Sequence, residues 1–331
     1  MGKITRISTK DMTREDWLQE RRKSLGGSDM GAVLGLNRWR SPYTVWAEKC
    51  GMLEDQPDSE AMRIGRDLEP YVLQRFQEAS GYKTKHVNAI IRNSSFPHLH
   101  ANVDSMVVGQ SAGVEAKTAS ALNARVFRDG EFPATYYAQC VTYLAVTNSA
   151  RWYLAVLVMG REFKIYQLTR IEDDLVPEWC ESSVYVPQAE IDALNDAANA
   201  FWERVENGDP PPTDETKSTT DTLDSIYHAD EEEADLEALE ATVSLLLEVT
   251  AKMKELKELS DGYKNEIKGF MKEASAGRSS LAKITWREQG KRSFDAKKLE
   301  EDHPELDLSP YYKTTISRVF RVSPVKTKGE E

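Results

Sequence analysis

The first two thirds of the chain alternate between segments with helical periodicity and segments with the two-residue alternation of strands. Apolar residues at helical spacing predict helices at residues 13–24, 28–35, 42–51, 59–81, 133–146 and 188–206. Alternating and β-branched runs predict strands at residues 85–92, 100–108, 113–118, 151–159 and 162–168. Helices, three strands, a helix and two more strands follow one another along the chain. This order predicts an α/β fold with a mixed central sheet flanked by helices.

The last third has a different pattern. Residues 210–230 are rich in Pro, Thr, Ser and acids, which predicts a flexible acidic linker. Over residues 231–275 apolar side chains recur every three or four positions, which predicts one long amphipathic helix or a helix pair with a coiled-coil-like seam. Strand patterns at 281–286 and 313–322 enclose a helical pattern at 295–301. Residues 276–331 are therefore expected to form a small α+β module.

Charge is unevenly distributed and does not exclude nucleic acid as a ligand. The 331 residues carry a formal charge of −12, but eleven acids and one base lie between residues 214 and 240. The rest of the chain is close to neutral and has basic clusters in its N-terminal part. A locally basic groove for phosphates is therefore compatible with the composition, although charge alone decides nothing.

Several protein classes conflict with the sequence. The longest apolar run, residues 152–159, is far shorter than the roughly 18 residues that span a bilayer. The first ten residues lack the apolar region of a secretory signal, so we expect a cytoplasmic protein. Cys50, Cys140 and Cys180 are too few for a four-cysteine iron-sulfur cluster. No phosphate-binding loop of the ATP-driven motors is present either.

Candidate chemistry is densest between residues 65 and 143. Alternation along the predicted strand places Glu115 and Lys117 on one face, about 6–7 Å apart. Asp104 lies eleven residues earlier, at the expected turn-side end of a neighbouring strand. Two carboxylates form a hard-oxygen site for Mg²⁺, and a neighbouring ammonium can orient water or neutralise developing charge. The pattern predicts phosphodiester hydrolysis.

Further polar residues are expected to join this site. Glu69 lies on a predicted helix, four residues after Gly65. Gln139 and Tyr143 share one face of another helix. Ser28 is expected at a helix N-cap with Arg21 seven residues before it, a combination suited to a phosphate group.

These motifs together resemble the PD-(D/E)xK nuclease superfamily, and within it the YqaJ-type phage recombinases and phage lambda exonuclease, over residues 17–168. That superfamily has a restriction-endonuclease-like core, in agreement with the fold predicted above. The resemblance implies that Asp104, Glu115 and the backbone carbonyl of Ala116 bind Mg²⁺. Glu69 would complete a second metal site or orient the water.

Roles for the other residues follow from the same resemblance. Lys117 would assist the nucleophile, and Gln139 would hold it in place. Arg21 and Ser28 would grip a 5′ phosphate, and Tyr143 is a further candidate for a DNA contact. Arg125 and Arg128 are expected to guide DNA from their charge and position alone. An all-oxygen site would admit Mn²⁺ as well as Mg²⁺.

The resemblance implies an exonuclease of the alkaline exonuclease type. It would degrade one strand of linear duplex DNA from 5′ to 3′ and leave 3′ single-stranded overhangs for recombination. It would close as a homotrimeric ring and act beside a single-strand annealing protein of the RecT or Red-beta type, in a bacterial cell that carries the phage or prophage. The exonuclease domain is expected at residues 1–209, and the C-terminal extension is where the chain departs from the compact lambda enzyme.

Two other functions remain open at this point. A PD-(D/E)xK endonuclease would have the same metal site, because dependence on a DNA end comes from the channel and the phosphate pocket. The long helix and its acidic leader are also compatible with a DNA-binding scaffold or adaptor of the recombination machinery. Asp104, Glu115 and Lys117 are all present, which favours a nuclease over a scaffold.

Overall fold

The computed structural model describes residues 2–54, 59–229, 233–313 and 320–323. The chain forms two compact units, Met1–His228 and Ala229–Glu331, which are described separately below. Within the described residues, no helix has both the length and the apolar character needed to cross a membrane.

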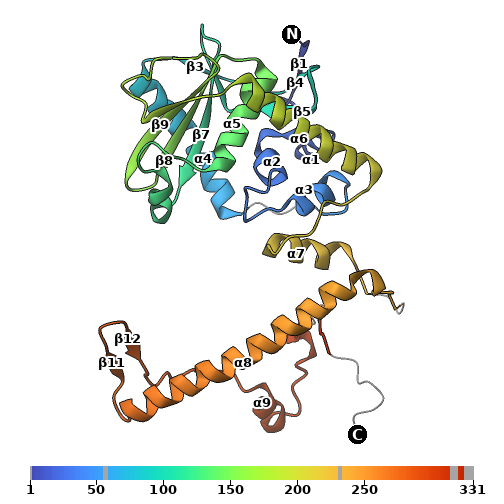
Figure 1. The fold of residues 1–331 in the computed structure, drawn as a ribbon, viewed down its shortest axis with the longest axis vertical. Coiled ribbons are helices and arrows are strands. Elements are labelled where there is room, and N and C mark those ends of the chain that lie inside the picture. The colour runs from blue at the N-terminus through green and yellow to red at the C-terminus, as the bar shows by residue number, and fades with distance from the viewer. Residues whose placement is uncertain (1, 55–58, 230–232, 314–319, 324–331) are drawn as a thin grey trace. The chain divides into compact units, whose positions relative to one another are not determined.

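The first unit is built on two sheets (Figure 1). The larger, six-stranded sheet has the order β10 (Ser182–Tyr185), β9 (Glu162–Thr169), β8 (Arg151–Val158), β7 (Ala112–Ala119), β6 (Ser105–Val107) and β3 (Thr84–His86). In it β7 pairs with β8 in parallel, as β9 does with β10, while the other pairs are antiparallel. The smaller sheet has the order β1 (Ile4–Ser8), β4 (Ala89–Asn93), β5 (Phe96–Asn102) and β2 (Leu25–Gly26).

Helices cover both faces of the larger sheet (Figure 1). On one face, α4 (Glu60–Ser80) packs Phe76 against Tyr153 of β8, with ring centroids 5.4 Å apart. On the other face, α5 (Ala134–Thr147) packs Tyr143 against Trp152, at 5.3 Å. Successive strand residues point to opposite faces, so adjacent β8 residues belong to two different cores. The predicted α/β fold with a helix-flanked mixed sheet is confirmed.

Two of the predicted strands are divided between the sheets. The strand expected at 85–92 is β3 in the larger sheet and β4 in the smaller one, and the strand expected at 100–108 is likewise β5 and β6. The prediction of two continuous strands was wrong, because partner strands, and not the local apolar pattern, decide where a strand changes sheet. Asp104 lies at the second of these crossings, between β5 and β6.

The segment expected as a flexible linker contains a helix instead. α7 (Lys217–Ile226) begins after Thr216, whose side chain accepts a hydrogen bond from the Thr219 backbone N–H. Its buried Thr222 hydroxyl lies 2.7 Å from the Thr44 hydroxyl of α3 (Pro42–Lys49). The composition was misleading, because these small hydroxyl side chains form hydrogen bonds with one another across a helix interface and not with water.

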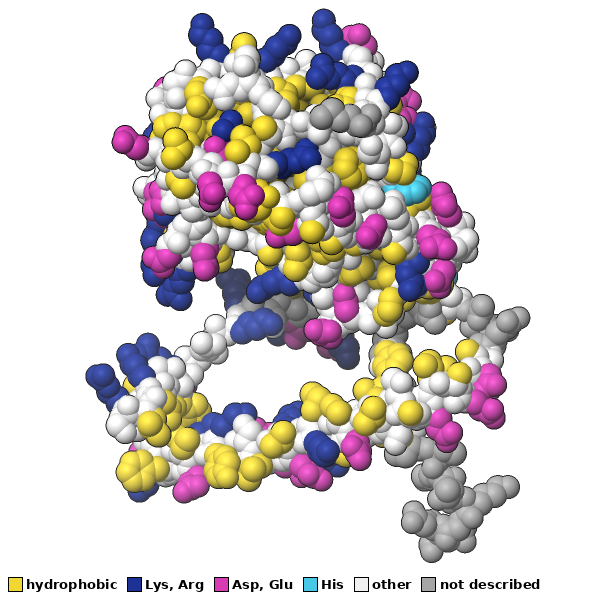
Figure 2. All heavy atoms as spheres, turned by 45° about the horizontal axis from the view of Figure 1, so that its top comes forward, with side chains coloured by type: hydrophobic (Ala, Val, Ile, Leu, Met, Phe, Trp, Pro, Cys, Tyr) yellow, Lys and Arg dark blue, Asp and Glu magenta, His cyan; other side chains and the backbone are white. Residues whose placement is uncertain are grey.

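The second unit has little buried surface. A single helix, α8 (Glu240–Met271), replaces the alternative of a helix pair, and none of its residues is buried. Figure 2 shows apolar side chains along it. The exposed apolar residues of this helix include Met253 and Leu256. β11 (Ala276–Arg278), β12 (Lys283–Thr285) and α9 (Ala296–Asp302) confirm a small α+β appendage. Most of the strand expected at 313–322 lies outside the described residues.

Candidate active site

An ion pair on β7 forms the centre of the site. The Lys117 ammonium lies 2.6 Å from Glu115 Oε1. The Glu115 side chain is only 3% exposed, whereas that of Lys117 is 23% exposed and can reach a bound substrate. Strand alternation presents Val114 and Ala116 to the core beside α4, and Glu115 and Lys117 to the side of α5. The expected meeting of carboxylate and ammonium is present.

Asp104 joins the pair through the backbone of β7. Its Oδ2 accepts a hydrogen bond of 2.8 Å from the Ala116 N–H. β6 pairs with β7 only at Gly113 and Val114, so this edge of the strand is open at Ala116. Because the N–H and C=O of one strand residue point to the same side, the Ala116 carbonyl also faces the Asp104 side of the strand.

The electrostatics of the site disfavour two ionised acids. Burial, followed by the charge of Asp104, raises the pKa of Glu115 to about 8 although Lys117 opposes the shift. Burial also raises the pKa of Asp104, against the effects of Lys117 and the Ala116 N–H. For Lys117, burial lowers the pKa, but the nearby carboxylates outweigh it and the net shift is upward. Two acids that resist joint ionisation are a favourable place for an additional cation.

The oxygen atoms of the site decide whether a hard divalent cation fits it. No three His, Cys, Asp or Glu side chains converge on one point in the part of the chain that the structure describes. Mg²⁺ does not need such a cluster, because it commonly takes one or two carboxylates and keeps several waters. Glu115 Oε2 is buried without a hydrogen-bond partner, which leaves an unsatisfied oxygen for a cation. Asp104, Glu115 and the Ala116 carbonyl therefore fit Mg²⁺.

Glu69 lies at the edge of this group on α4. Burial and the charge of Asp104 raise its pKa, while His86 and Lys117 oppose the shift. The charges of Asp104 and Lys117 therefore act on Glu69, but Glu69 forms no hydrogen bond with either residue in the described structure. His86 Nδ1 lies 3.9 Å from Glu69 Oε1. No sequence motif pointed to His86, which pairs with Ser105 beside Asp104.

Helix α5 supplies the second polar layer of the site. Gln139 Nε2 donates to Glu115 Oε1 at 2.7 Å and to the Tyr143 hydroxyl at 2.9 Å. The ring of Tyr136 lies 5.3 Å from Lys117 Nζ. The expected shared helix face is present. The Tyr143 side chain is 3% exposed and packs in the core, and its expected contact with DNA stays a prediction.

Arg21 and Ser28 lie together, as their spacing suggested. Arg21 Nη2 donates to the Ser28 hydroxyl at 3.2 Å, and the guanidinium stacks on Trp17. The expected N-cap role of Ser28 is wrong. α2 (Gly27–Val33) has Gly26 as its N-cap, and the Gly26 N–H donates to Asp29 Oδ2 at 2.8 Å. Asp29 takes over the local capping, so the Ser28 hydroxyl is left to Arg21 and to a ligand.

Two glycines bring this pair close to the catalytic layer. A Cβ atom at Gly27 would lie 2.5 Å from Tyr143 Cε1, and one at Gly26 would lie 2.9 Å from His100 Nε2. Only glycine permits such an approach of backbone to side chain. The Gly-Gly dipeptide before Ser28 is the sequence signal for this packing.

Arg125 and Arg128 are not brought to the site. Arg125 is exposed on η1 (Ala121–Phe127), the short helix that follows β7, and Arg128 is exposed directly after it. Neither forms an ion pair within the described residues. Their expected contact with DNA stays a prediction from charge and position.

The comparisons with known proteins agree with the motifs. Residues 16–150 match the YqaJ-like viral recombinase domain. The uncharacterized protein YqaJ of Bacillus subtilis (strain 168) is 32% identical over 303 residues, covering 89% of this chain and 90% of the relative.

Similar solved structures are more distant. An alkaline exonuclease from Laribacter hongkongensis has 19% identity and a TM-score of 0.47, covering 59% of this chain and 93% of its own. A putative exonuclease from Eubacterium rectale has 12% identity and a TM-score of 0.39, covering 69% of this chain and 98% of its own. Because the sequence match covers nine tenths of the Bacillus subtilis relative, the chain belongs to the family of YqaJ-like viral recombinases.

Proposed function

We propose that the protein is a Mg²⁺-dependent deoxyribonuclease that degrades one strand of linear duplex DNA from its 5′ end. The observation that carries this proposal is the meeting of Asp104, Glu115 and Lys117 at one edge of β7. Two carboxylates beside one ammonium suit the hydrolysis of a phosphodiester. Membership in a recombinase family supports DNA as the substrate.

Each residue has a distinct part in the proposed reaction. Asp104, Glu115 and the Ala116 carbonyl hold Mg²⁺ or Mn²⁺, and Glu69 completes a second metal site or orients the water. When bound, the cation polarises the phosphodiester and lowers the pKa of a coordinated water. Lys117 stays protonated beside the carboxylates and donates hydrogen bonds to the charge that develops on the phosphate or to the attacking water.

The second polar layer fixes these groups in place. Gln139 donates to the same Glu115 oxygen that pairs with Lys117, and its other contact anchors it to the buried Tyr143. A carboxylate held by two donors cannot rotate away from the strand. This arrangement keeps the geometry ready before substrate binds.

The Arg21 and Ser28 pair is proposed to bind a terminal 5′ phosphate. Its guanidinium and hydroxyl are both donors, and a phosphate has three acceptor oxygens. Anchoring the end in this pocket would set which bond lies at the metal site. Products would be 3′ overhangs of the kind that a single-strand annealing protein uses.

For the assembly we propose a homotrimeric ring and contact with an annealing protein of the RecT or Red-beta type in the bacterial cytoplasm. The exposed apolar side chains of α8, including Met253, Leu256 and Tyr263, are proposed to contact protein. Removal of the chain after His228 is expected to leave nuclease activity intact and to remove partner binding or self-association. Retention of both would contradict this role for the second unit.

The test of the function is digestion with Mg²⁺ and without ATP. Linear duplexes with 5′-phosphate or 5′-hydroxyl ends are compared with a closed circle of the same sequence, using Asp104→Asn as the inactive control. Loss of the linear form alone, fastest from phosphorylated ends, is expected. Nicking of the circle would show an endonuclease instead, and cleavage of neither substrate would refute the nuclease.

A further inference from the structure

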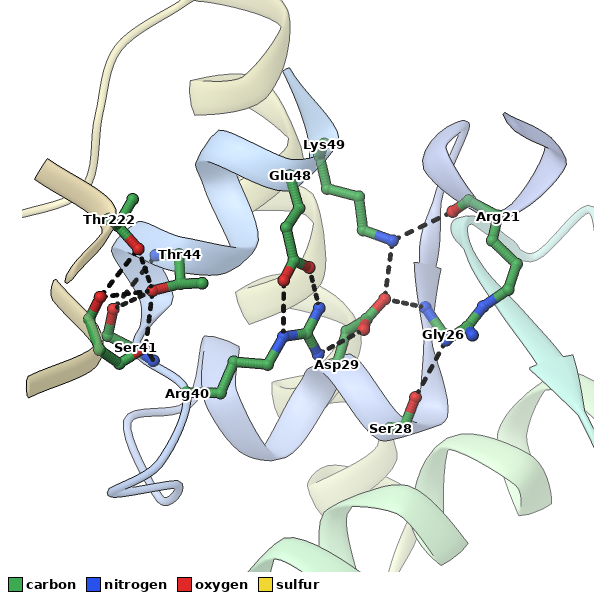
Figure 3. A network of polar contacts seen from close by, with 11 residues as sticks. Arg21, Gly26, Ser28, Asp29, Arg40, Ser41, Thr44, Glu48, Lys49 and Thr222 are labelled. Carbon is green, nitrogen blue, oxygen red and sulfur yellow. Dashed lines mark hydrogen bonds and ion pairs between the residues drawn. The ribbon is translucent and has the colours of Figure 1, made fainter. Parts of the chain in front are cut away.

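A cluster of four charged side chains, of which Asp29 and Lys49 are buried, lies beside the proposed phosphate pocket (Figure 3). At its centre the Asp29 side chain, 1% exposed, pairs through Oδ1 with Arg40 Nη1 at 2.8 Å and through Oδ2 with Lys49 Nζ at 2.7 Å. Glu48 pairs with the other side of Arg40. We call Asp29, Arg40, Glu48 and Lys49 the Asp29 cluster.

The charges of the cluster balance without Arg21. Its two acids pair with its two bases, whereas the Arg21 guanidinium has no ion pair within the described residues. That guanidinium donates to the Ser28 hydroxyl, and its Nε is buried without a hydrogen-bond partner. One positive charge is therefore left over at the pocket, where a phosphate can pair with it.

Lys49 links the helix that carries Arg21 to the helix that carries Ser28. Its ammonium, on a side chain that is 5% exposed, donates to the Arg21 backbone carbonyl at 3.0 Å as well as pairing with Asp29. Arg21 lies in the last turn of α1 (Arg14–Arg22), and Asp29 directly follows Ser28 in α2. Figure 3 shows the Lys49 ammonium between these two partners. One ammonium thus ties the backbone of the arginine to the helix that carries the serine.

Asp29 also fixes the turn that leads into the pocket. The same Oδ2 that binds Lys49 accepts the Gly26 N–H at 2.8 Å. Burial opposes the ionisation of Asp29, but Lys49 and Arg40 outweigh it and hold its pKa well below the usual range. The enclosed carboxylate is thus held in place by three donors, the Gly26 N–H, Arg40 and Lys49. Such buried ion pairs add little net stability, and their best-attested use is to select a single geometry.

We infer that Lys49 and Asp29 are positioning residues that set the spacing of Arg21 and Ser28, and thereby the selectivity for 5′-phosphorylated DNA ends. This inference rests on the proposed function, since it specifies what makes the phosphate pocket selective. Neither residue touches DNA in this account. Their effect passes through the backbone of Arg21 and the start of α2.

The test substitutes Lys49→Met in the full chain, which removes the ammonium and keeps the apolar stem. Binding of hairpin duplexes with a 5′-phosphate or a 5′-hydroxyl end is measured by fluorescence anisotropy, with Ca²⁺ replacing Mg²⁺ to prevent cleavage. The wild-type protein is expected to bind the phosphorylated end about tenfold more tightly or better. In Lys49→Met this ratio is expected to fall to about twofold or less.

Arg151→Met is the matched control. Arg151 also forms an ion pair in the first unit, at 2.6 Å from Asp174, and the pair has no contact with the Asp29 cluster. Its loss is expected to lower the melting temperature and leave the phosphate ratio at the wild-type value. An equal fall of the ratio in both variants would show general destabilisation and would overturn the inference.

The remaining outcomes separate the inference from the proposed function. A wild-type ratio near one would overturn the phosphate pocket, and the positioning role with it. A wild-type ratio that Lys49→Met retains would overturn the positioning role alone. If Lys49→Met does not fold, Lys49→Arg keeps the charge but has a larger, planar head, whose donors change the geometry of both contacts. It is expected to lower the ratio at least about threefold, and an unchanged ratio would refute the role of Lys49.

Discussion

Binding of Mg²⁺ to Asp104 and Glu115 is expected to release a proton from Glu115. Burial and the charge of Asp104 raise the pKa of this carboxyl to about 8, against the opposing effect of Lys117. At pH 7 a group with that pKa is about 90% protonated. A carboxylate that binds a metal must be ionised. Each Mg²⁺ bound at pH 7 should therefore displace about 0.9 proton.

Isothermal titration calorimetry in two buffers of different ionisation enthalpy measures this number directly. Released protons are taken up by the buffer, so the apparent binding enthalpy changes with the buffer in proportion to the release. At pH 9, where about a tenth of the Glu115 carboxyls keep their proton, the release should fall to about 0.1. Glu115→Gln removes the titrating group and should abolish the buffer dependence. Binding of Mg²⁺ at pH 7 without proton release would refute the reasoning about the site.

Three further predictions concern single residues. Lys117→Met should lower kcat about 10²-fold to 10³-fold, because it removes a charged donor at the reacting phosphate. The variant should still bind duplex DNA in Ca²⁺. Single-turnover cleavage within tenfold of the wild-type rate would contradict the role of Lys117. Ser28→Ala should weaken the preference for 5′-phosphorylated ends in a kinetic comparison of both ends, with little change in cleavage of a bound end; equal loss on both ends would count against the pocket. Burial, with Lys49 and Arg21 nearby, lowers the pKa of His100 from 6.5 to about 3. Below pH 6.5 the unfolded chain binds a proton that the folded chain excludes, so the free energy of unfolding should fall by at most about 1.4 kcal/mol per pH unit down to pH 3. Urea unfolding across this range checks the slope, which His100→Gln should reduce.

Local sequence patterns were sufficient to predict contacts between residues of the same strand or helix. Strand alternation predicted the Glu115 and Lys117 pair, and the helical spacing of four predicted the contact between Gln139 and Tyr143. Both follow from the backbone period alone. The capping box also has a sequence signature, an acid three residues after Gly26, which would have placed Asp29 and not Ser28 in the local capping role.

Tertiary contacts decided the rest. Arg40, Glu48 and Lys49 look like ordinary surface charges in sequence, and only the packing of α3 and the loop before it against α2 brings them together around Asp29. The burial of Tyr143 likewise depends on the approach of Gly27, 116 positions earlier in the chain. The helix at Lys217–Ile226 depends on α3 for its hydroxyl partners, so its composition alone suggested a linker.

The central claim is that Asp104, Glu115 and Lys117 hydrolyse one strand of a duplex from its 5′ end. The most direct measurement uses a linear duplex with one phosphorylated and one blocked 5′ end, and with separate fluorescent labels near the two ends of the phosphorylated strand. With Mg²⁺, the label near the 5′ phosphate is expected to be released first and the complementary strand is expected to stay whole. Lys117→Met is expected to release the labels about 10²-fold to 10³-fold more slowly. Release that begins at the 3′ label, or equal attack on both strands, would contradict the account.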